Sequence, residues 1–402
     1  MKEIFKTFLS LTILIVISTL IYLAWIINKG EFTSQYLEKF INDRFKSEKF
    51  YTSIQNPIIK FDKKKKRIIV DGKNFSIFSI EKEKISEFKN LKIHINLLPL
   101  ITERKLVTNK IEMIEGKIDL PAVFGKTLKI NSIQLEGNLN LDDNEIIIDN
   151  FSTSIEEDLY EGSAKLNLID FLAEGFLTKV SRKKIFYNLD LDSENMKFLV
   201  NEHEFNIEGN ATLGGVDIVL KGKKNYKDKN KFISKYNVSG KIDENVIEKL
   251  VNLKVTPYIK GPIELNASYL IFQGNKEKIK MSNKLKETEL NIPALGITKY
   301  KGTVATADID FNFSNKKLKE IKIINYKQGN NEINGSVKLS KEFKPFKSLE
   351  LNLMKDDKKT SIKVLRNKDL NNLDLKGDYF DFSKILKETF FEEKKEDSFL
   401  IQ

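Results

Sequence analysis

The sequence has no cysteine and few histidine, tryptophan or proline residues. Its 402 residues include two histidines, seven prolines and one tryptophan. The absence of cysteine excludes disulfides, thiolate zinc sites and cysteine nucleophiles. Two histidines are too few for a multi-histidine metal centre. Because proline interrupts the hydrogen-bond ladder of a sheet, its scarcity leaves long stretches of the chain free to pair as strands.

The basic residues are almost all lysine. The chain carries 68 Lys+Arg against 57 Asp+Glu, a net charge of +11. Only five of the basic residues are arginine, namely Arg44, Arg67, Arg104, Arg182 and Arg366. Bidentate recognition of phosphate and guanine favours arginine, so the net charge does not indicate a nucleic-acid partner. The densest basic run, residues 63–67, predicts the solvated tip of a hairpin, with contact to an anionic lipid surface as the alternative.

The sequence also lacks the short motifs that carry common enzyme chemistry. The patterns G-x-x-x-x-G-K-[ST], G-x-G-x-x-G, H-E-x-x-H and G-x-S-x-G do not occur. His94 and His203 each lie in an alternating run, which predicts solvent-facing strand histidines rather than catalytic ones. We therefore expect no enzyme activity, no catalytic residue, no metal and no cofactor.

One long uncharged run lies near the N-terminus. Residues 7–27 contain no charged side chain, and a helix of that length spans about 31 Å, the thickness of a bilayer core. A cleaved signal peptide is the alternative, but its apolar region is shorter and a small-x-small site follows it. We therefore expect residues 1–29 to form a cytoplasmic N-terminus and a single transmembrane anchor. The helical spacing of apolar residues predicts an amphipathic capping helix over residues 34–45.

From Ile58 onward, apolar and polar residues alternate with a period of two. The alternating runs include residues 321–323, 349–353 and 362–364, and they predict antiparallel strands with one apolar and one polar face. The fold class is therefore mainly β with a few short amphipathic helices. We expect an elongated, curved antiparallel sheet that forms an open apolar groove.

The glycines follow this alternation. Twelve of the 19 glycines lie two residues after a large apolar side chain, with a polar residue between: Gly72, Gly116, Gly137, Gly162, Gly209, Gly222, Gly240, Gly261, Gly274, Gly302, Gly335 and Gly377. Two interpretations stay open. The glycines mark kinks or bulges that curve a wide sheet, or they are ordinary turn glycines at strand ends.

A longer pattern occurs twice and suggests the domain organisation. Residues 238–243 and 375–381 each read as a strand ending in apolar-x-Gly, followed by an aspartate and helically spaced apolar residues. Each predicts a strand, an aspartate N-cap and an amphipathic helix. The predicted domains are an N-terminal β-groove segment over residues 30–237 and a β module over residues 238–392. Residues 393–402 form a tail.

Two groups of motifs resemble the AsmA-like superfamily. Leu97-Leu98-Pro99-Leu100-Ile101, followed by residues 110–118, resembles its early motif. Residues 258–262 and 290–302 resemble the YhdP central-domain family, with Ile297-Thr298 where an aromatic residue is expected before Lys299. The resemblance implies a single-pass bacterial inner-membrane protein with most of the chain in the periplasm. Its implied partners are the inner membrane, through residues 7–27, and phospholipid acyl chains.

Two functions follow as hypotheses. The first is a β-groove that binds phospholipid acyl chains and conducts them between the inner and outer membranes. The second is a non-enzymatic assembly factor that docks an outer-membrane or periplasmic protein partner. A conduit needs a continuous apolar strip, whereas a docking body has a closed core. The alternating pattern gives these candidate groove-lining residues: Ile111, Met113, Leu139, Leu141, Ile321, Ile323, Leu351 and Leu353.

The anchor generates a first testable prediction. The mature protein should retain residues 7–27. A reporter that works only in the periplasm should be active when fused at the C-terminus, and a reporter that works only in the cytoplasm should be inactive there. The reason is the length of the uncharged run and the missing cleavage site. N-terminal sequencing and paired reporter fusions measure both properties. A mature chain that begins near residue 28 would contradict the anchor.

Overall fold

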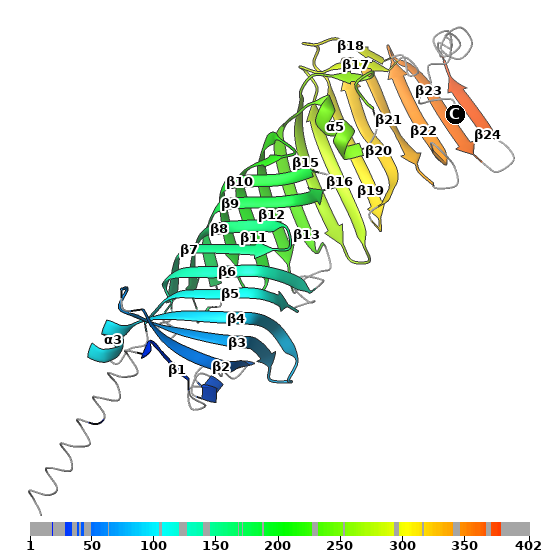
Figure 1. Ribbon diagram of the computed structural model, residues 1–402. Helices are drawn as coiled ribbons and strands as arrows, with labels where there is room; N and C mark the ends of the chain where they lie inside the picture. Colours follow the sequence, from blue (N-terminus) through cyan, green and yellow to red (C-terminus); the bar gives the residue numbers. More distant parts are fainter. Residues whose placement is uncertain are drawn as a thin grey trace, which may run out of the picture. The chain divides into compact units, whose positions relative to one another are not determined.

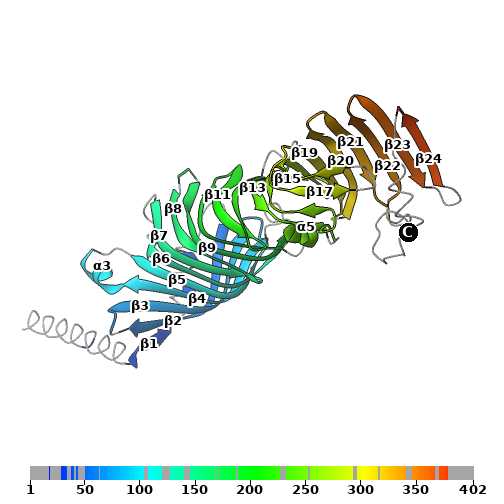
Figure 2. The same ribbon diagram turned by 90° about the horizontal axis from the view of Figure 1, so that it is seen from above.

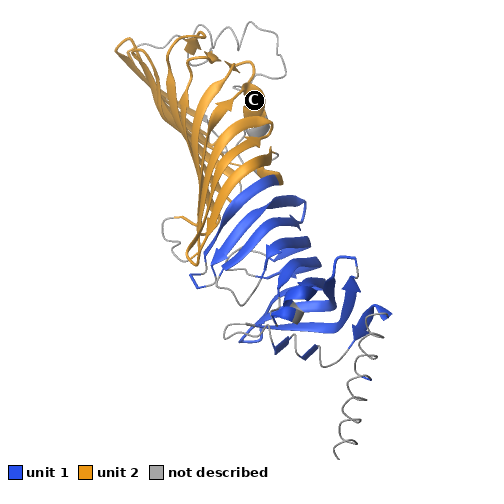
Figure 3. Ribbon diagram, turned by 90° about the vertical axis from the view of Figure 1, so that its left-hand side faces the viewer, with its two compact units in different colours: residues 1–180 blue, residues 181–402 orange. Residues whose placement is uncertain are grey.

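The structure is a computed structural model. In it the chain forms two compact units, residues 1–180 and 181–402 (Figure 3). The described residues are 18, 29–33, 38–39, 42–43, 50–62, 64–103, 107–119, 127–139, 145–167, 169–170, 172–186, 189–226, 232–251, 254–292, 297–315, 317–340, 346–366 and 371–378. Most of them lie in antiparallel strands, which confirms the prediction of a mainly β protein. The sequence-based domain limits at 237/238 and 392/393 stay a prediction.

The first unit is a run of strands in which each strand pairs with the one before it. It contains β1 (Glu31–Thr33), β2 (Phe50–Asp62), β3 (Arg67–Ser79), β4 (Lys84–Asn96), β5 (Thr108–Ile118), β6 (Leu128–Asn138), β7 (Glu145–Ile155), β8 (Asp158–Asn167) and the first part of β9 (Leu172–Phe186). The pairing from β1 to β8 is antiparallel throughout. One short helix, α3 (Leu97–Thr102), follows β4. Figures 1 and 2 show β3 to β8 side by side in chain order.

The second unit continues this arrangement but carries two insertions. Its main strands are β10 (Leu189–Val200), β11 (Glu204–Leu213), β12 (Val216–Asn225), β13 (Ser234–Ile242), β15 (Ile263–Phe272), β16 (Lys276–Lys284), β19 (Thr306–Ser314), β20 (Lys317–Gln328), β21 (Asn331–Lys338), β22 (Ser348–Lys355), β23 (Lys358–Arg366) and β24 (Asn371–Gly377). Helix α5 (Glu244–Val251) and β14 (Ile259–Lys260) lie between β13 and β15. Strands β17 (Glu289–Ile292) and β18 (Ile297–Lys299) lie between β16 and β19, and they form a small sheet with β14.

Helix α5 begins where the sequence predicts it. Asp243 follows β13, and its Oδ1 accepts a hydrogen bond of 3.1 Å from the Val246 amide. This is the N-cap geometry that satisfies a free amide of the first turn. Apolar residues at helical spacing, among them Val246 and Ile247, then pack on the core of the unit. The strand, aspartate cap and amphipathic helix predicted from residue 238 onward are therefore confirmed.

Opposite faces of the strands differ in the way that the alternation predicts. On β16, Ile279 and Met281 face the apolar interior, while Lys278 lies on the other face and pairs with Asp310 at 2.7 Å. Similar ion pairs join neighbouring strands elsewhere on that outer face, such as Lys363 with Glu350 at 2.8 Å. Each exposed pair contributes about 0–1 kcal/mol to stability. The ion pairs therefore identify the polar face, and the apolar face provides most of the stability.

The glycines of the predicted pattern fall into two groups. Three of the twelve lie outside strands with positive φ: Gly261, Gly274 and Gly302. The other nine lie within strands. At Gly116, a Cβ atom would lie 2.3 Å from the Phe88 ring, and at Gly335 one would lie 2.1 Å from the Glu350 carbonyl oxygen. The strand glycines therefore make room for close packing of neighbouring strands, and the turn interpretation holds for the other three only.

The two histidines differ from their predicted setting. His203 is exposed, but it lies in the turn between β10 and β11 rather than in a strand. His94 does lie in β4, but its side chain is only 15% exposed and its Nε2 lies 3.7 Å from Glu112 Oε1. The long side chains of the neighbouring strand cover it, and this burial lowers the pKa of His94. The prediction is therefore correct for the exposure of His203 but not for its place in a strand, and correct for the place of His94 in a strand but not for its exposure.

Several predicted elements lie wholly or partly outside the described residues. They are the anchor over residues 7–27, most of the capping helix over residues 34–45 and the helix expected after Gly377. Within the second of these, residues 38–39 and 42–43 are helical, and Asn42 Oδ1 accepts a 3.0 Å hydrogen bond from the Ile54 amide. Among the residues that the structure describes, no helix is long and apolar enough to cross a membrane.

The close packing at Gly335 generates a second prediction. The variant Gly335→Ala should lower the free energy of unfolding by about 1–3 kcal/mol, because its Cβ requires β21 and β22 to move apart. Urea unfolding of the full chain measures the change. The variant Ser336→Ala, one residue along on the opposite face, should stay within about 0.5 kcal/mol of the wild type. Equal stabilities of the two variants would show that the strand glycine is not needed for packing.

Candidate functional site: an apolar cavity in the second unit

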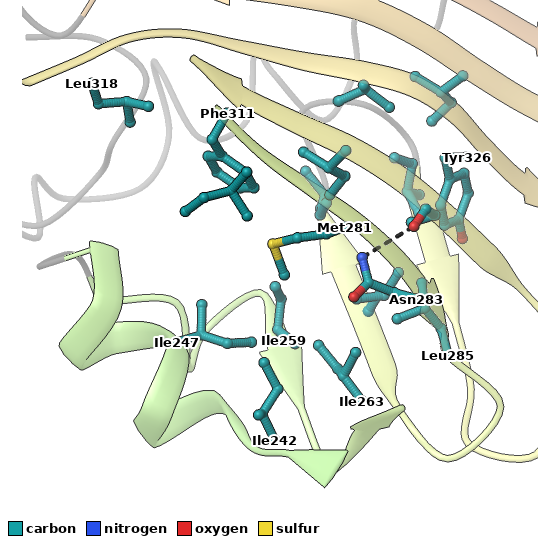
Figure 4. A pocket seen from close by; sticks show the side chains of 18 of the residues that line it. Ile242, Ile247, Ile259, Ile263, Met281, Asn283, Leu285, Phe311, Leu318 and Tyr326 are labelled. Atoms are coloured by element: carbon teal, nitrogen blue, oxygen red, sulfur yellow. Dashed lines mark hydrogen bonds between the residues drawn. The ribbon is translucent and has the colours of Figure 1, made fainter. Parts of the chain in front are cut away.

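An apolar cavity of the second unit lies between its main sheet and the inserted elements. Its volume is about 410 Å³. Among the residues that the structure describes, nineteen line it, and all of these except Asn283 and Tyr326 have side chains made only of carbon, hydrogen and sulfur. The floor comes from the main strands, chiefly β16, β19 and β20. The cover comes from α5 and the small sheet, through residues such as Ile247, Ile259 and Leu290 (Figure 4).

The floor is ordered in rows that run across the strands. Met281 pairs with Ile309, and Ile309 pairs with Ile323. Because paired residues of neighbouring strands lie on the same face, each row presents its side chains together. The alternation of the sequence places the apolar members of β16 and β19 on the cavity side. The result is a floor of contiguous hydrocarbon.

Two glutamates of α5 accept hydrogen bonds that hold the parts of the cover together. Glu244 Oε2 accepts a 2.9 Å bond from the Gly261 amide. Glu248 Oε1 accepts bonds of 2.9 Å from the amides of Val255 and Thr256, and a further bond from the Thr256 hydroxyl. These bonds lower the pKa of Glu248. Helix α5 is thereby held against the turn that leads into β14.

A buried lysine fixes the small sheet. The side chain of Lys299 is 1% exposed, and its ammonium group donates to the carbonyl oxygens of Thr288, Tyr300 and Lys286 at 2.5, 3.2 and 3.4 Å. Burial lowers the pKa of Lys299, and Glu287 and Glu289 act in the opposite direction. Thr288 is itself fully buried and donates from its hydroxyl to the Pro262 carbonyl at 2.7 Å. These contacts hold β18 against the turn that precedes β17.

Two polar side chains line the cavity, and they lie in one row. Asn283 pairs with Ala307, and Ala307 pairs with Tyr326. The Tyr326 hydroxyl donates to Gln328 Oε1 at 2.7 Å, and burial raises the pKa of Tyr326 to about 12. Asn283 donates from Nδ2 to the Ala307 carbonyl at 3.0 Å, while its buried Oδ1 has no hydrogen-bond partner.

The predicted groove residues of the second unit share one face. Ile323 lines the cavity, and Ile321 pairs with Phe311, which also lines it. Leu353 packs against the same cluster as Ile323. Leu351 is buried and pairs with Gly335, which in turn pairs with Ile323. A role of these residues in holding lipid remains a prediction.

The predicted residues of the first unit lie on its own apolar face. Ile111 and Met113 pack on a cluster of buried residues in β2, β3 and β4. Leu139 is buried among residues of β7, and Ile111 contacts that cluster too. Leu141 lies outside the described residues. The structure therefore describes seven of the eight candidates, three on the apolar face of the first unit and four on the apolar face of the second unit.

Sequence reasoning missed Asn283, Lys299 and the covering side chains. Asn283 had a usable signal, because it continues the phase of Ile279 and Met281 on the apolar face of β16. Lys299 had none, since a lysine in a short alternating run reads as solvent-exposed. The cover depends on contacts between distant segments.

Comparisons with known proteins and a search for metal ligands give no further assignment. No protein-family model, curated protein sequence or solved structure matches this chain. Within the described part of the chain, no group of three or more His, Cys, Asp or Glu side chains could hold a metal ion. The cavity therefore has to be interpreted from its own residues.

The buried lysine generates a third prediction. The variant Lys299→Met should lower the free energy of unfolding at pH 7 by about 2 kcal/mol, because the Thr288 carbonyl loses a charged donor. The folded pKa of Lys299 is lowered, so the unfolded chain binds more protons between that pKa and its ordinary value. Wild-type stability should therefore rise with pH across this window relative to the variant. Urea unfolding of both chains at pH 7 and pH 10 measures the difference, and a constant difference would contradict the assignment.

Proposed function

We propose that this chain binds acyl chains of phospholipids on its apolar faces and conducts them between the inner and outer membranes of a bacterium. The observation that carries the proposal is the cavity of about 410 Å³ with seventeen hydrocarbon or thioether side chains among its nineteen lining residues. An apolar space of this kind suits a flexible hydrocarbon ligand better than a polar substrate. The resemblance to the AsmA-like superfamily supports the same ligand.

The energetics favour hydrocarbon in this site. Each buried methylene contributes about 0.8 kcal/mol, so a chain of several methylenes offsets the ordering of the ligand. No catalytic step and no cofactor is required, since transfer along an apolar face makes and breaks no covalent bond. We propose that residues 7–27 anchor the chain in the inner membrane and that the β-strands lie in the periplasm.

Docking of an outer-membrane or periplasmic protein is the second candidate. Leu351 and Ile362 are 4% and 7% exposed, which is the burial expected of a closed core. A closed core would leave the outer surface of the strands, rather than their apolar face, as the functional part. The two candidates predict different contacts for the inward-facing side chains.

Site-specific cross-linking generates the fourth prediction and separates the two candidates. The full chain would carry a photoreactive benzophenone amino acid at position 323, on the cavity side, or at position 322, on the outer face. In bacteria grown with radiolabelled phosphate, irradiation should attach labelled phospholipid at position 323 and not at 322. Protein cross-links at position 322, without lipid at 323, would contradict acyl-chain binding and favour docking. Lipid at neither position would also contradict acyl-chain binding.

A pair of charge variants provides the matched control. Met281→Lys places an ammonium group in the cavity, whereas Ser282→Lys places it on the opposite face, across from Asp308. A buried charge is strongly unfavourable beside hydrocarbon. The first variant should reduce lipid cross-linking at position 323 by about tenfold or more, and the second should leave it unchanged. If Met281→Lys unfolds the chain, Ile309→Trp, which fills the cavity without a charge, provides the same test.

A further inference from the structure

Three features of the first unit meet at one end of its strands: the point where the chain enters the unit, a basic turn and a short apolar helix. Strand β1 pairs with β2 in an antiparallel register that places Glu31 opposite Lys60. The preceding residue, Gly30, accepts a 3.0 Å hydrogen bond from the Phe61 amide. The chain therefore enters the first unit beside the last residues of β2.

The covalent chain limits how far this end lies from the proposed anchor. Residues 7–27 are proposed to cross the inner membrane, and Gly30 follows three residues later. Three residues span at most about 11 Å. A second stretch of three residues separates Phe61 from Lys64, which lies in the turn between β2 and β3. The turn therefore has to lie within roughly 30 Å of the last residue of the proposed anchor.

Residues 64–66 of the basic run form the turn between β2 and β3. Asp62 Oδ1 accepts hydrogen bonds of 3.1 Å from the amides of Lys64 and Lys65, an arrangement in which an aspartate side chain stabilises a turn. Lys64, Lys65 and Lys66 are all exposed. Within the described part of the chain, no acidic side chain forms an ion pair with any of them. The turn therefore presents three positive charges that the fold does not neutralise.

Helix α3 lies beside this turn. Arg67 pairs with Asn96, the residue before α3, and the Leu97 amide donates to the Lys66 carbonyl oxygen at 3.4 Å. Figure 1 shows α3 at the same end of the strands. Leu98 of α3 is 71% exposed, although it is a large apolar side chain. An exposed leucine beside unpaired lysines combines hydrocarbon with positive charge, which is typical of segments that bind at the interface of a bilayer.

We propose that residues 64–66 and Leu98 dock this end of the first unit on anionic phospholipid head groups of the inner membrane. The inference rests on the proposed function and identifies the surface through which the unit meets the membrane that supplies its lipid. Lysines attract anionic lipid without a defined geometry, and each lysine near such a surface strengthens binding about fivefold. Leu98 adds hydrocarbon that enters the interface.

The turn at the opposite end of β3 differs in charge. Residues 80–83, between β3 and β4, include exposed Glu81, Lys82 and Glu83. Two glutamates and one lysine do not attract an anionic surface. The same turn carries Ile80, an apolar side chain that is 60% exposed. Ile80 therefore provides a control for Leu98, with a similar exposure in the same unit and without the basic turn.

A single introduced cysteine tests the contact, because the chain has none of its own. The full chain would carry Leu98→Cys or Ile80→Cys, labelled with a nitrobenzoxadiazole dye, in nanodiscs of phosphatidylcholine alone or of an equal mixture with phosphatidylglycerol. The fifth prediction is that nitroxide-labelled acyl chains quench the dye at position 98 at least about fivefold more strongly in the anionic discs than in the neutral ones. The dye at position 80 should be quenched in neither.

Charge variants then locate the preference for anionic lipid. The triple variant K64Q/K65Q/K66Q should weaken docking about a hundredfold, so that quenching at position 98 becomes the same in both kinds of disc. The matched control, K355Q/K358Q/K359Q, removes the same charge from exposed lysines at the hairpin of β22 and β23 and should leave the quenching unchanged. All six side chains are exposed, so neither variant should unfold the chain.

Salt provides an independent readout. The Debye length falls to about 3 Å in 1 M salt, so quenching at position 98 in the anionic discs should fall as well. Equal quenching at positions 98 and 80, or quenching at 98 that does not depend on phosphatidylglycerol, would overturn the docking surface. Either result would leave acyl-chain binding intact, because cross-linking at position 323 measures it separately. A full chain that does not enter the discs would instead contradict the anchor of the proposed function.

Discussion

The apolar faces of this protein depend on the cross-strand register of the antiparallel strands. Side chains alternate between faces with a period of two, so a slip of one residue would exchange every inward and outward position. On β16 such a slip would bury Lys278 and Lys280 and expose Ile279 and Met281. The ion pair between Lys278 and Asp310, at 2.7 Å, joins neighbouring strands only in the observed register. Individually such pairs contribute little to stability, but together they disfavour the alternative pairings.

This register also determines where small residues are needed. Each row of the apolar face brings large side chains of neighbouring strands together, and rows composed only of such residues would be overcrowded. Gly335 lies between Ile323 and Leu351 in one row, where a Cβ would lie 2.8 Å from a Leu351 methyl group. In the cover, Gly261 has a positive φ, and its amide reaches Glu244 at 2.9 Å. The sheet and its cover thus both depend on a backbone position that other residues fill poorly.

The sequence is sufficient for the parts of this structure that depend on local pattern. The alternation around Leu351 predicts β22, and the spacing after Asp243 predicts the cap and the helix α5, because both rest on neighbouring residues. The setting of His94 and the burial of Lys299 depend on which strands lie beside them, and the alternating pattern does not identify the neighbouring strands. The pattern does not predict the cavity either, because its cover comes from two insertions that are separated in the chain by β15 and β16. Inward residues such as Ile323 can be assigned to a face, but not to a cavity.

Two buried polar side chains of the second unit differ in how the cost of their burial is compensated. Lys299 and Asn283 are 1% and 5% exposed. The Lys299 ammonium group donates to three carbonyl oxygens, so its burial is compensated within the fold and its role is to hold the small sheet. Asn283 is compensated at its nitrogen only, and its free acceptor costs about 1–3 kcal/mol that a leucine would not. Lys299 therefore fixes the cover with all of its contacts made inside the fold, whereas Asn283 lies on the floor with only one of its two polar side-chain atoms hydrogen-bonded.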